Sequence, residues 1–180
     1  EILMKYMEGE NYITHSYAVE AIMRGLAKRL APDDVEYWGI VGLLHDLDEE
    51  QCDWQHDMSV HGPTSAEILR KEGIEDKVLF DAICAHNPKS GVKAKTTLQY
   101  AILAADPMSG FVKAVAQIYP DKKIASVKHK SVMKRFNELR FAKGANRDYM
   151  EAIEFTGLSL DDLIDVALEE MGFIADKLGL

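Results

Sequence analysis

The side chains most suited to chemistry in this sequence are histidines and aspartates that stand beside apolar segments. Six of them follow one another along the chain: His15, His45, Asp46, His61, His86 and Asp106. An unpaired imidazole or ionised carboxylate among buried apolar residues is costly, so each of these groups needs a partner. Imidazole nitrogens and carboxylate oxygens together suit Fe, Mn, Co, Ni or Zn better than Ca or Mg alone. The six residues therefore predict a site for a divalent transition metal, with Mg as a further option.

Each of these residues, taken singly, also has an ordinary structural explanation. A histidine at a helix end more often caps the helix or packs in the core than binds a metal. Six such placements in one chain favour the metal. Cys52 and Cys84 stand in no metal-finger spacing, so a closed structural zinc site is disfavoured. Two isolated thiols are typical of a reducing, cytoplasmic compartment.

Helical periodicity predicts the elements that position these residues, because apolar side chains recur at three- and four-residue steps. Residues 48–59 are polar and without period, and they predict a loop beside the His45–Asp46 pair. Pro107 should kink or end the helix that precedes it at Asp106. The predicted helices are 13–30, 32–45, 62–73, 76–86, 97–105, 109–118, 128–142, 146–155 and 159–178.

The fold class that follows is all-α, because no alternating run of β-branched residues predicts a strand. Ser159 and Asp162 form a variant capping box at the start of the last helix. The length of 180 residues predicts a single domain. We expect a motif-bearing core over about 13–112 and further C-terminal helices over 113–180.

The order and surroundings of the six residues resemble the HD superfamily, of the HDIG type, of metal-dependent phosphohydrolases. The segments that carry the resemblance read "THSYAVEA", "GLLHDLD", "HGPTSAEIL", "AICAHN" and "AILAADPMSG". The resemblance implies an HD-domain helical bundle. It also implies a first ion held by His15, His45, Asp46 and Asp106. A second ion would be held by Asp46, as the bridging carboxylate for the metal-bound water, with His61 and His86.

The activity implied by the resemblance is hydrolysis of a phosphate ester or anhydride, with a nucleotide or another small phosphorylated molecule as substrate. Many hydrolytic members read HD-Ile-Gly-Lys, whereas this chain continues with Leu47, Asp48, Glu49 and Glu50. Asp48 or Glu49 could orient water or hold a ligand histidine, and a solvated acidic loop is the alternative. The Gly-Tyr-Pro sequence of the cyclic-dinucleotide branch is absent. A diiron oxygenase and a non-catalytic nucleotide sensor are the competing interpretations.

The charge of the chain limits the classes of molecule that it is expected to bind. A net charge of −9 argues against general nucleic-acid binding, and no run of roughly 18 apolar residues predicts a membrane span. Residues 122–147 nevertheless hold nine Lys and Arg against one acid. Such a segment could face an anionic substrate, although a solvated helix face is the more common explanation. Our substrate-binding predictions are Lys113, Lys134, Arg135 and Arg147, and the oligomeric state is left open.

Two histidines lie outside the six-residue pattern. His56 could gate the pocket or donate a proton to a leaving group, although a surface loop position is more common. His129 has no role in the pattern. Trp54, near His56, could stack on a base, but we favour packing of the loop.

Overall fold

The computed structural model describes residues 1–180, is built of helices and turns, and contains no strand. The all-α prediction is confirmed. Short 3-10 turns occur at Pro32–Asp34, Met58–Val60, Pro88–Ser90, Ile124–Ser126 and Ala152–Thr156. The helices are α1 (Ile2–Tyr6), α2 (Glu10–Leu30), α3 (Val35–Leu44), α4 (Pro63–Lys71), α5 (Lys77–Ala85), α6 (Thr97–Gln117), α7 (His129–Phe136), α8 (Arg147–Glu151), α9 (Leu160–Phe173) and α10 (Ala175–Leu178).

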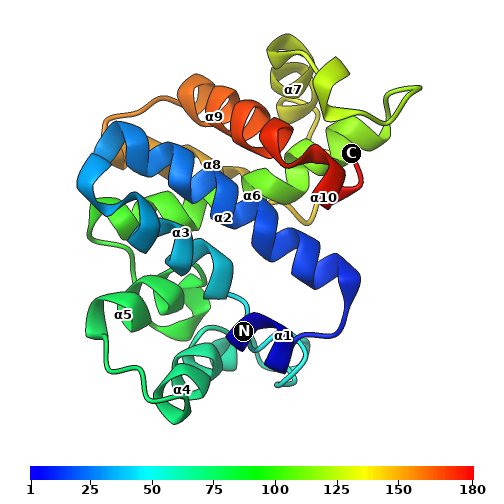
Figure 1. Ribbon diagram of the computed structural model, residues 1–180. Coiled ribbons are helices and arrows are strands. Elements are labelled where there is room, and N and C mark those ends of the chain that lie inside the picture. The colour runs from blue at the N-terminus through cyan, green and yellow to red at the C-terminus, as the bar shows by residue number, and fades with distance from the viewer.

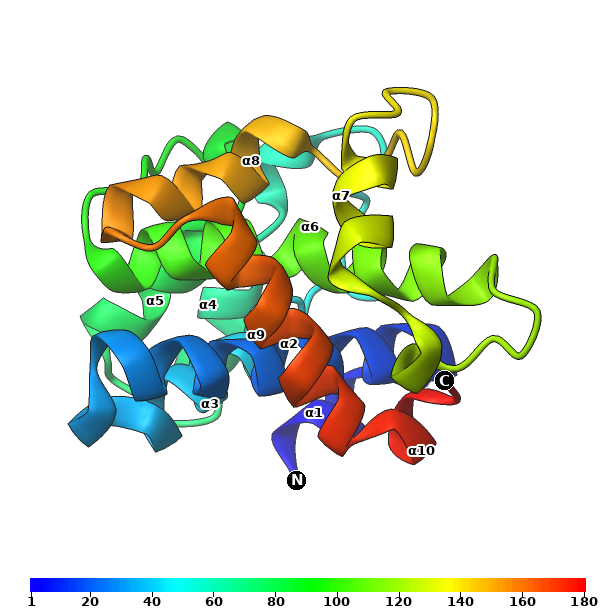
Figure 2. The same cartoon turned by 90° about the horizontal axis from the view of Figure 1, so that it is seen from above.

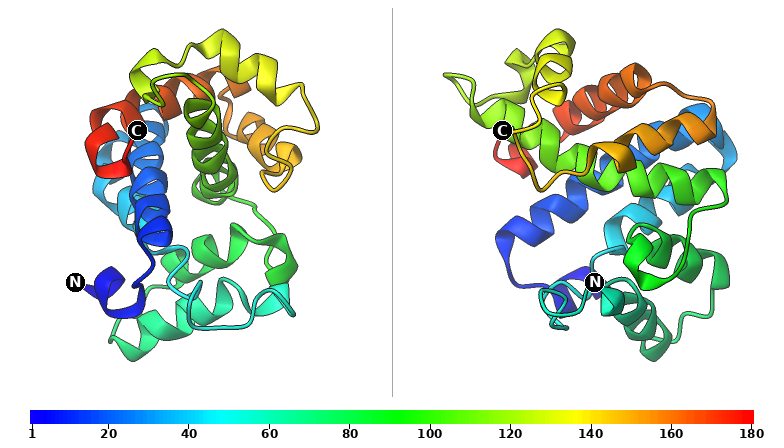
Figure 3. Two further views of the ribbon diagram at one scale, coloured as in Figure 1. Left: turned by 90° about the vertical axis from the view of Figure 1, so that its right-hand side faces the viewer. Right: turned by 180° about the vertical axis from the view of Figure 1, so that it is seen from behind.

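Two long helices, α2 and α6, run in opposite directions through the middle of the molecule (Figure 1). Helices α3 and α9 pack on α2, and Figure 2 shows α8 lying along α6. Helices α4 and α5 lie together at one end, below α2 and α6 in Figure 3. Gly42 lets α3 approach α2 closely, since a Cβ there would lie 2.9 Å from the Val19 carbonyl oxygen.

One hydrophobic core of 41 buried residues runs through these helices. Phe111, in the second half of α6, is the largest of the fully buried side chains. Val166 and Met171 of α9 belong to the same core, so the C-terminal helices pack against the helices that carry the histidines. None of the helices combines the length and the apolar character that crossing a bilayer requires.

Helix α6 departs from the sequence prediction, because it continues through Pro107 as one helix. The two separate helices predicted at 97–105 and 109–118 are therefore wrong. A proline inside a helix costs about 3 kcal/mol, since it removes a backbone donor and crowds the preceding turn. Ala105, Met108 and Phe111 are fully buried on both sides of the proline. Tertiary packing of these residues holds the helix together across Pro107.

The C-terminal predictions are right about helix but wrong about several boundaries. Helix α7 ends at Phe136, and the chain turns with a positive φ of 41° at Ala142, which a helix does not allow. The predicted 159–178 helix is interrupted at Ile174 into α9 and α10. The capping box of Ser159 and Asp162 is confirmed.

Candidate metal centre

The six predicted ligands come from five helices or their ends and meet at one place. The backbone after α3 presents two of them, His61 lies two residues before α4, His86 directly follows α5, and α2 and α6 supply the others. Their ligand atoms form two groups, each with all atoms within 4.8 Å of one another. The groups are His15, His45, Asp46 and Asp106, and Asp46, His61 and His86.

Asp46 stands at the centre because it belongs to both groups. Its Oδ1 lies 3.2 Å from His45 Nε2 and 3.3 Å from the Nε2 atoms of His61 and His86. Its Oδ2 lies 3.3 Å from His15 Nε2. One carboxylate thus faces four imidazoles with its two oxygens, which is the position of a bridging ligand.

The outward nitrogens of His45 and His86 face backbone carbonyls in the last turns of their own helices. His45 Nδ1 lies 2.7 Å from the Gly42 oxygen, and His86 Nδ1 hydrogen-bonds to the Ile83 oxygen. A carbonyl oxygen only accepts, so each Nδ1 carries the hydrogen and donates it. With Nδ1 committed to a carbonyl, each of these rings turns its Nε2 towards Asp46.

Asp48 orients the third imidazole. Its Oδ1 accepts from His61 Nδ1 at 2.8 Å, and its Oδ2 accepts from the backbone amides of Gly62 and Ser65 at 2.7 and 3.1 Å. Asp48 is fully buried, and these three donors satisfy its charge. A φ of +92° at Gly62 turns the chain from His61 into α4. Glu49 makes no hydrogen bond to a ligand histidine.

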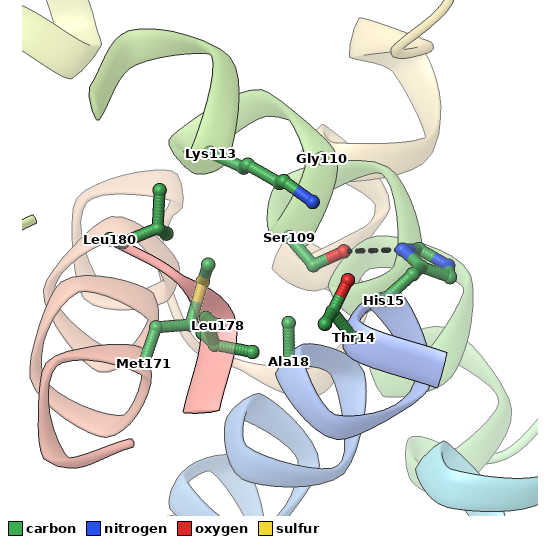
Figure 4. Close-up of a pocket in the computed structure, with 9 residues that line it drawn as sticks. All are labelled: Thr14, His15, Ala18, Ser109, Gly110, Lys113, Met171, Leu178 and Leu180. Atoms are coloured by element: carbon green, nitrogen blue, oxygen red, sulfur yellow. Dashed lines mark hydrogen bonds between the residues drawn. The ribbon is translucent and has the colours of Figure 1, made fainter. Parts of the chain in front are cut away.

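Ser109 orients the fourth imidazole and was not predicted. Its Oγ lies 3.1 Å from His15 Nδ1 (Figure 4) and donates to the Asp106 carbonyl at 2.9 Å. Because the hydroxyl has one hydrogen, Ser109 accepts from His15 Nδ1–H and leaves His15 Nε2 facing the centre. The position three residues after Asp106 on a helix was the available signal.

Two inner atoms of the site have no hydrogen-bond partner. His45 Nε2 and Asp46 Oδ1 are buried without a hydrogen-bond partner. The Nε2 atoms of His61 and His86 lie 2.9 Å apart, although both imidazoles carry their hydrogen on Nδ1. Metal–nitrogen bonds of about 2.0–2.1 Å place neighbouring ligands roughly 3.0–3.4 Å apart. The donor set and its spacing therefore fit a cation of the transition-metal class.

The electrostatics of the cluster favour positive charge at its centre. Burial lowers the pKa of His45 and of His61, but the nearby carboxylates outweigh it and raise these pKa values to about 10 and about 11. Burial, with the charges of His45 and His61, lowers the pKa of His86 to about 4. The imidazoles hold the pKa of Asp46 well below its ordinary value. The carboxylate thus stays ionised, while the imidazoles cannot all be protonated together.

Access to the cluster comes from the side of Asp106. The Asp106 side chain is 28 % exposed, whereas that of His45 is fully buried. A cavity of about 210 Å³ opens beside Asp106, His61 and His86. A smaller cavity of about 20 Å³ lies at His15 and is lined by Lys113 (Figure 4).

The other three predicted substrate-binding residues lie elsewhere. Lys134 and Arg135 line a separate cavity of about 260 Å³, which contains none of the candidate ligands. Arg135 is paired with Glu138. Arg147 donates to backbone carbonyls, including those of Ala142 and Ala145 at 2.7 Å. Of the four predicted residues, only Lys113 lines a cavity together with a candidate ligand.

The residues outside the six-residue pattern stay outside the cluster. His56 is on the surface, as predicted, and pairs with Asp53. Trp54 donates to the Glu49 carbonyl within the loop, in line with a packing role. Both cysteines are free and half-buried. His129, at the start of α7, lies between two aspartates of α9.

Comparison with known proteins adds one match. The family model described as HD domain matches residues 12–127, a range that includes all six candidate ligands. No curated protein and no solved structure matches the chain. Helices α7 to α10 lie beyond the matched range.

Proposed function

Because the chain belongs to the HD domain family of metal-dependent hydrolases, we propose that it hydrolyses a phosphate ester or anhydride of a small molecule. A nucleotide or another small phosphorylated compound is the proposed substrate. The observation that carries the proposal is the position of Asp46, which is shared by two ligand groups. Such a carboxylate can hold two ions close together, and two-ion sites serve phosphoryl transfer.

Each of the two ligand groups would hold one metal ion. His15, His45 and Asp106 would hold one ion with Asp46, and His61 and His86 would hold a second with the same carboxylate. When bound, such ions lower the pKa of a bound water towards about 7 and neutralise charge on the phosphoryl oxygens.

The remaining residues keep the ligands in place. Asp48, Ser109 and two backbone carbonyls accept the Nδ1 hydrogens, so every Nε2 is available at the centre. Fixing the tautomer in this way orients the ring and increases its basicity as a ligand. Substrate would enter through the cavity beside Asp106, where the cluster is accessible.

The test is anaerobic purification with elemental analysis, followed by a panel of phosphate esters and anhydrides with Mn, Fe, Co, Ni and Mg. We expect up to two ions per chain and phosphate release that needs no oxygen. His86→Ala should lose the activity, whereas the control His56→Ala, at an exposed histidine, should keep it. Turnover that requires iron and oxygen would contradict hydrolysis and favour an oxygenase. A protein that binds metal and keeps its cellular function, but hydrolyses none of these substrates, would support a sensor.

A further inference from the structure

The cavity beside the metal cluster has a wall that the HD match does not include. Asn146 and Tyr149, at the start of α8, line it together with His61 and His86. Both residues lie beyond residue 127, where the family match ends. The segment 141–149 therefore brings side chains from outside the matched range to the place where substrate would meet the ligands.

Arg147 holds this segment in place. Its guanidinium donates to the carbonyls of Phe141, Ala142 and Ala145, and its Nε lies 3.5 Å from a fourth carbonyl. Its central carbon lies 4.7 Å from the centre of the Phe111 ring. An arginine has five N–H donors, and these contacts use most of them without an acidic partner. Arg147 cannot bind a substrate phosphate without releasing the backbone that it organises.

These contacts of Arg147, which we call the Arg147 clamp, also fix the distance between segment 141–149 and the cluster of candidate ligands. Phe111 lies on α6, five residues after Asp106, and is fully buried. The stacking of Arg147 on Phe111 thus ties the segment to the helix that supplies a candidate ligand, and Figure 2 shows α7 and α8 both against α6. The segment needs such support, because Ala142 has a positive φ that an alanine rarely adopts.

The chemistry of the cavity points to a substrate class. None of the residues that line it is lysine or arginine. Asn146 uses its side-chain oxygen to cap α8 and keeps its amide hydrogens available, and the Tyr149 hydroxyl makes no hydrogen bond within the protein. Further phosphate groups here would face Asp106 and would meet no lysine or arginine on the cavity wall. The volume of about 210 Å³ is also below the roughly 300–1,000 Å³ of sites for drug-sized ligands.

We propose that segment 141–149 is the specificity loop of the site, positioned by Arg147, and that Asn146 and Tyr149 hydrogen-bond the organic group of a small phosphate monoester. That group is neutral and hydroxyl-bearing, and a polyphosphate chain is disfavoured. The substrate class rests on the proposed function, whereas the positioning role of Arg147 does not.

Calorimetry on the Mn-loaded protein tests the contacts, with ribose 5-phosphate, inorganic phosphate and ATP as probes. Ribose 5-phosphate should bind about tenfold more tightly than either of the others, the scale of one or two hydrogen bonds. Tyr149→Phe, and Asn146→Ser, which keeps a capping oxygen, should remove most of that preference and leave phosphate binding unchanged. Asn137→Ser, at an exposed asparagine, is the matched control. An unchanged preference in both variants, or tighter binding of ATP, would overturn the substrate class.

Hydrogen exchange tests the clamp separately. In Arg147→Lys the amides of 141–146 should exchange about tenfold faster or more, with metal stoichiometry unchanged, because the compact ammonium of lysine lacks the planar fork of five donors that spans these carbonyls. Unchanged exchange there would overturn the positioning role. If this variant does not fold, the exchange of the same amides is measured in the wild-type protein and in Lys134→Ala. These amides should be equally protected in both, which still tests whether the segment is ordered. Absence of phosphate release from every substrate would refute hydrolysis, while binding and exchange would still decide this inference.

Discussion

Two of the regions where this protein places histidine beside aspartate are the central cluster around Asp46 and the surface contact of His129. In the cluster, each imidazole turns Nδ1 to an acceptor and Nε2 towards a shared carboxylate. At the surface, His129 Nδ1 and Nε2 each lie 2.6 Å from a carboxylate, of Asp165 and Asp161 respectively. The residue types are the same, but the orientation of the rings differs.

The orientation decides which cation each region needs. An imidazole between two carboxylates donates from both nitrogens, so a proton supplies the positive charge, and these hydrogen bonds raise the pKa of His129 against the effect of burial. In the cluster, the Nε2 atoms of several imidazoles converge on Asp46, and His45 Nε2 has no hydrogen-bond partner. Protons cannot occupy all these positions at once, so the cluster is suited to metal ions.

Removing the shared carboxylate should have the largest effect. Asp46→Asn keeps the shape of the side chain but removes the charge that both ligand groups share. We expect both ions to be lost and phosphate release to fall on the order of 10³-fold or more. Elemental analysis and initial rates would measure this, with Asp53→Asn, in an exposed pair with His56, as control. Retention of two ions by Asp46→Asn would contradict the bridging role.

Removing a ligand that belongs only to the group of Asp46, His61 and His86 should distinguish the two ligand groups. His86→Ala leaves His15, His45, Asp46 and Asp106 intact, so metal content should fall from two ions to one per chain. We expect activity to fall roughly 100-fold or more, because the second ion no longer neutralises the phosphoryl group. Metal titration followed by calorimetry would count the sites. A single metal site in the wild-type protein would show that Asp46, His61 and His86 hold no second ion.

Changing the residue behind a ligand should have a smaller effect. Asp48→Asn removes the charge that accepts from His61 Nδ1 and leaves all six ligands present. Loss of such a partner costs about 10–100-fold in metal affinity. The affinity of the second ion should fall by this factor, while the first changes little. Equal weakening of both ions would mean that Asp48 acts on the fold and not on His61.

The surface contact should give the smallest effect and no metal effect at all. His129→Gln should destabilise the protein by less than about 1 kcal/mol, as expected for a surface ion pair. Because the folded-state pKa is raised, the stabilising effect should be full below the unfolded pKa of about 6.5. It should disappear as the pH rises through the higher folded-state pKa. Urea unfolding at several pH values would measure it, and an effect that grows with pH would have the wrong sign.

The candidate ligands could be predicted from the sequence because each stands beside apolar residues with helical period. That arrangement is local, and it showed which histidines need a partner before any contact was known. The same local signals located most helices and the Ser159 cap. They missed the continuity of α6, because burial around Pro107 outweighs a local preference.

Tertiary structure decided the features that join distant parts of the chain. Ser109 meets His15 across 94 residues, and Arg147 turns inward to backbone carbonyls instead of outward to a substrate. A basic residue has the same local pattern whether it binds substrate or supports a loop, so its role depends on which elements pack around it. The sequence by itself therefore determined the helical class and predicted the candidate ligands. Only packing, which sets distances between remote residues, determined how the imidazoles are oriented and which residues line the cavity beside Asp106.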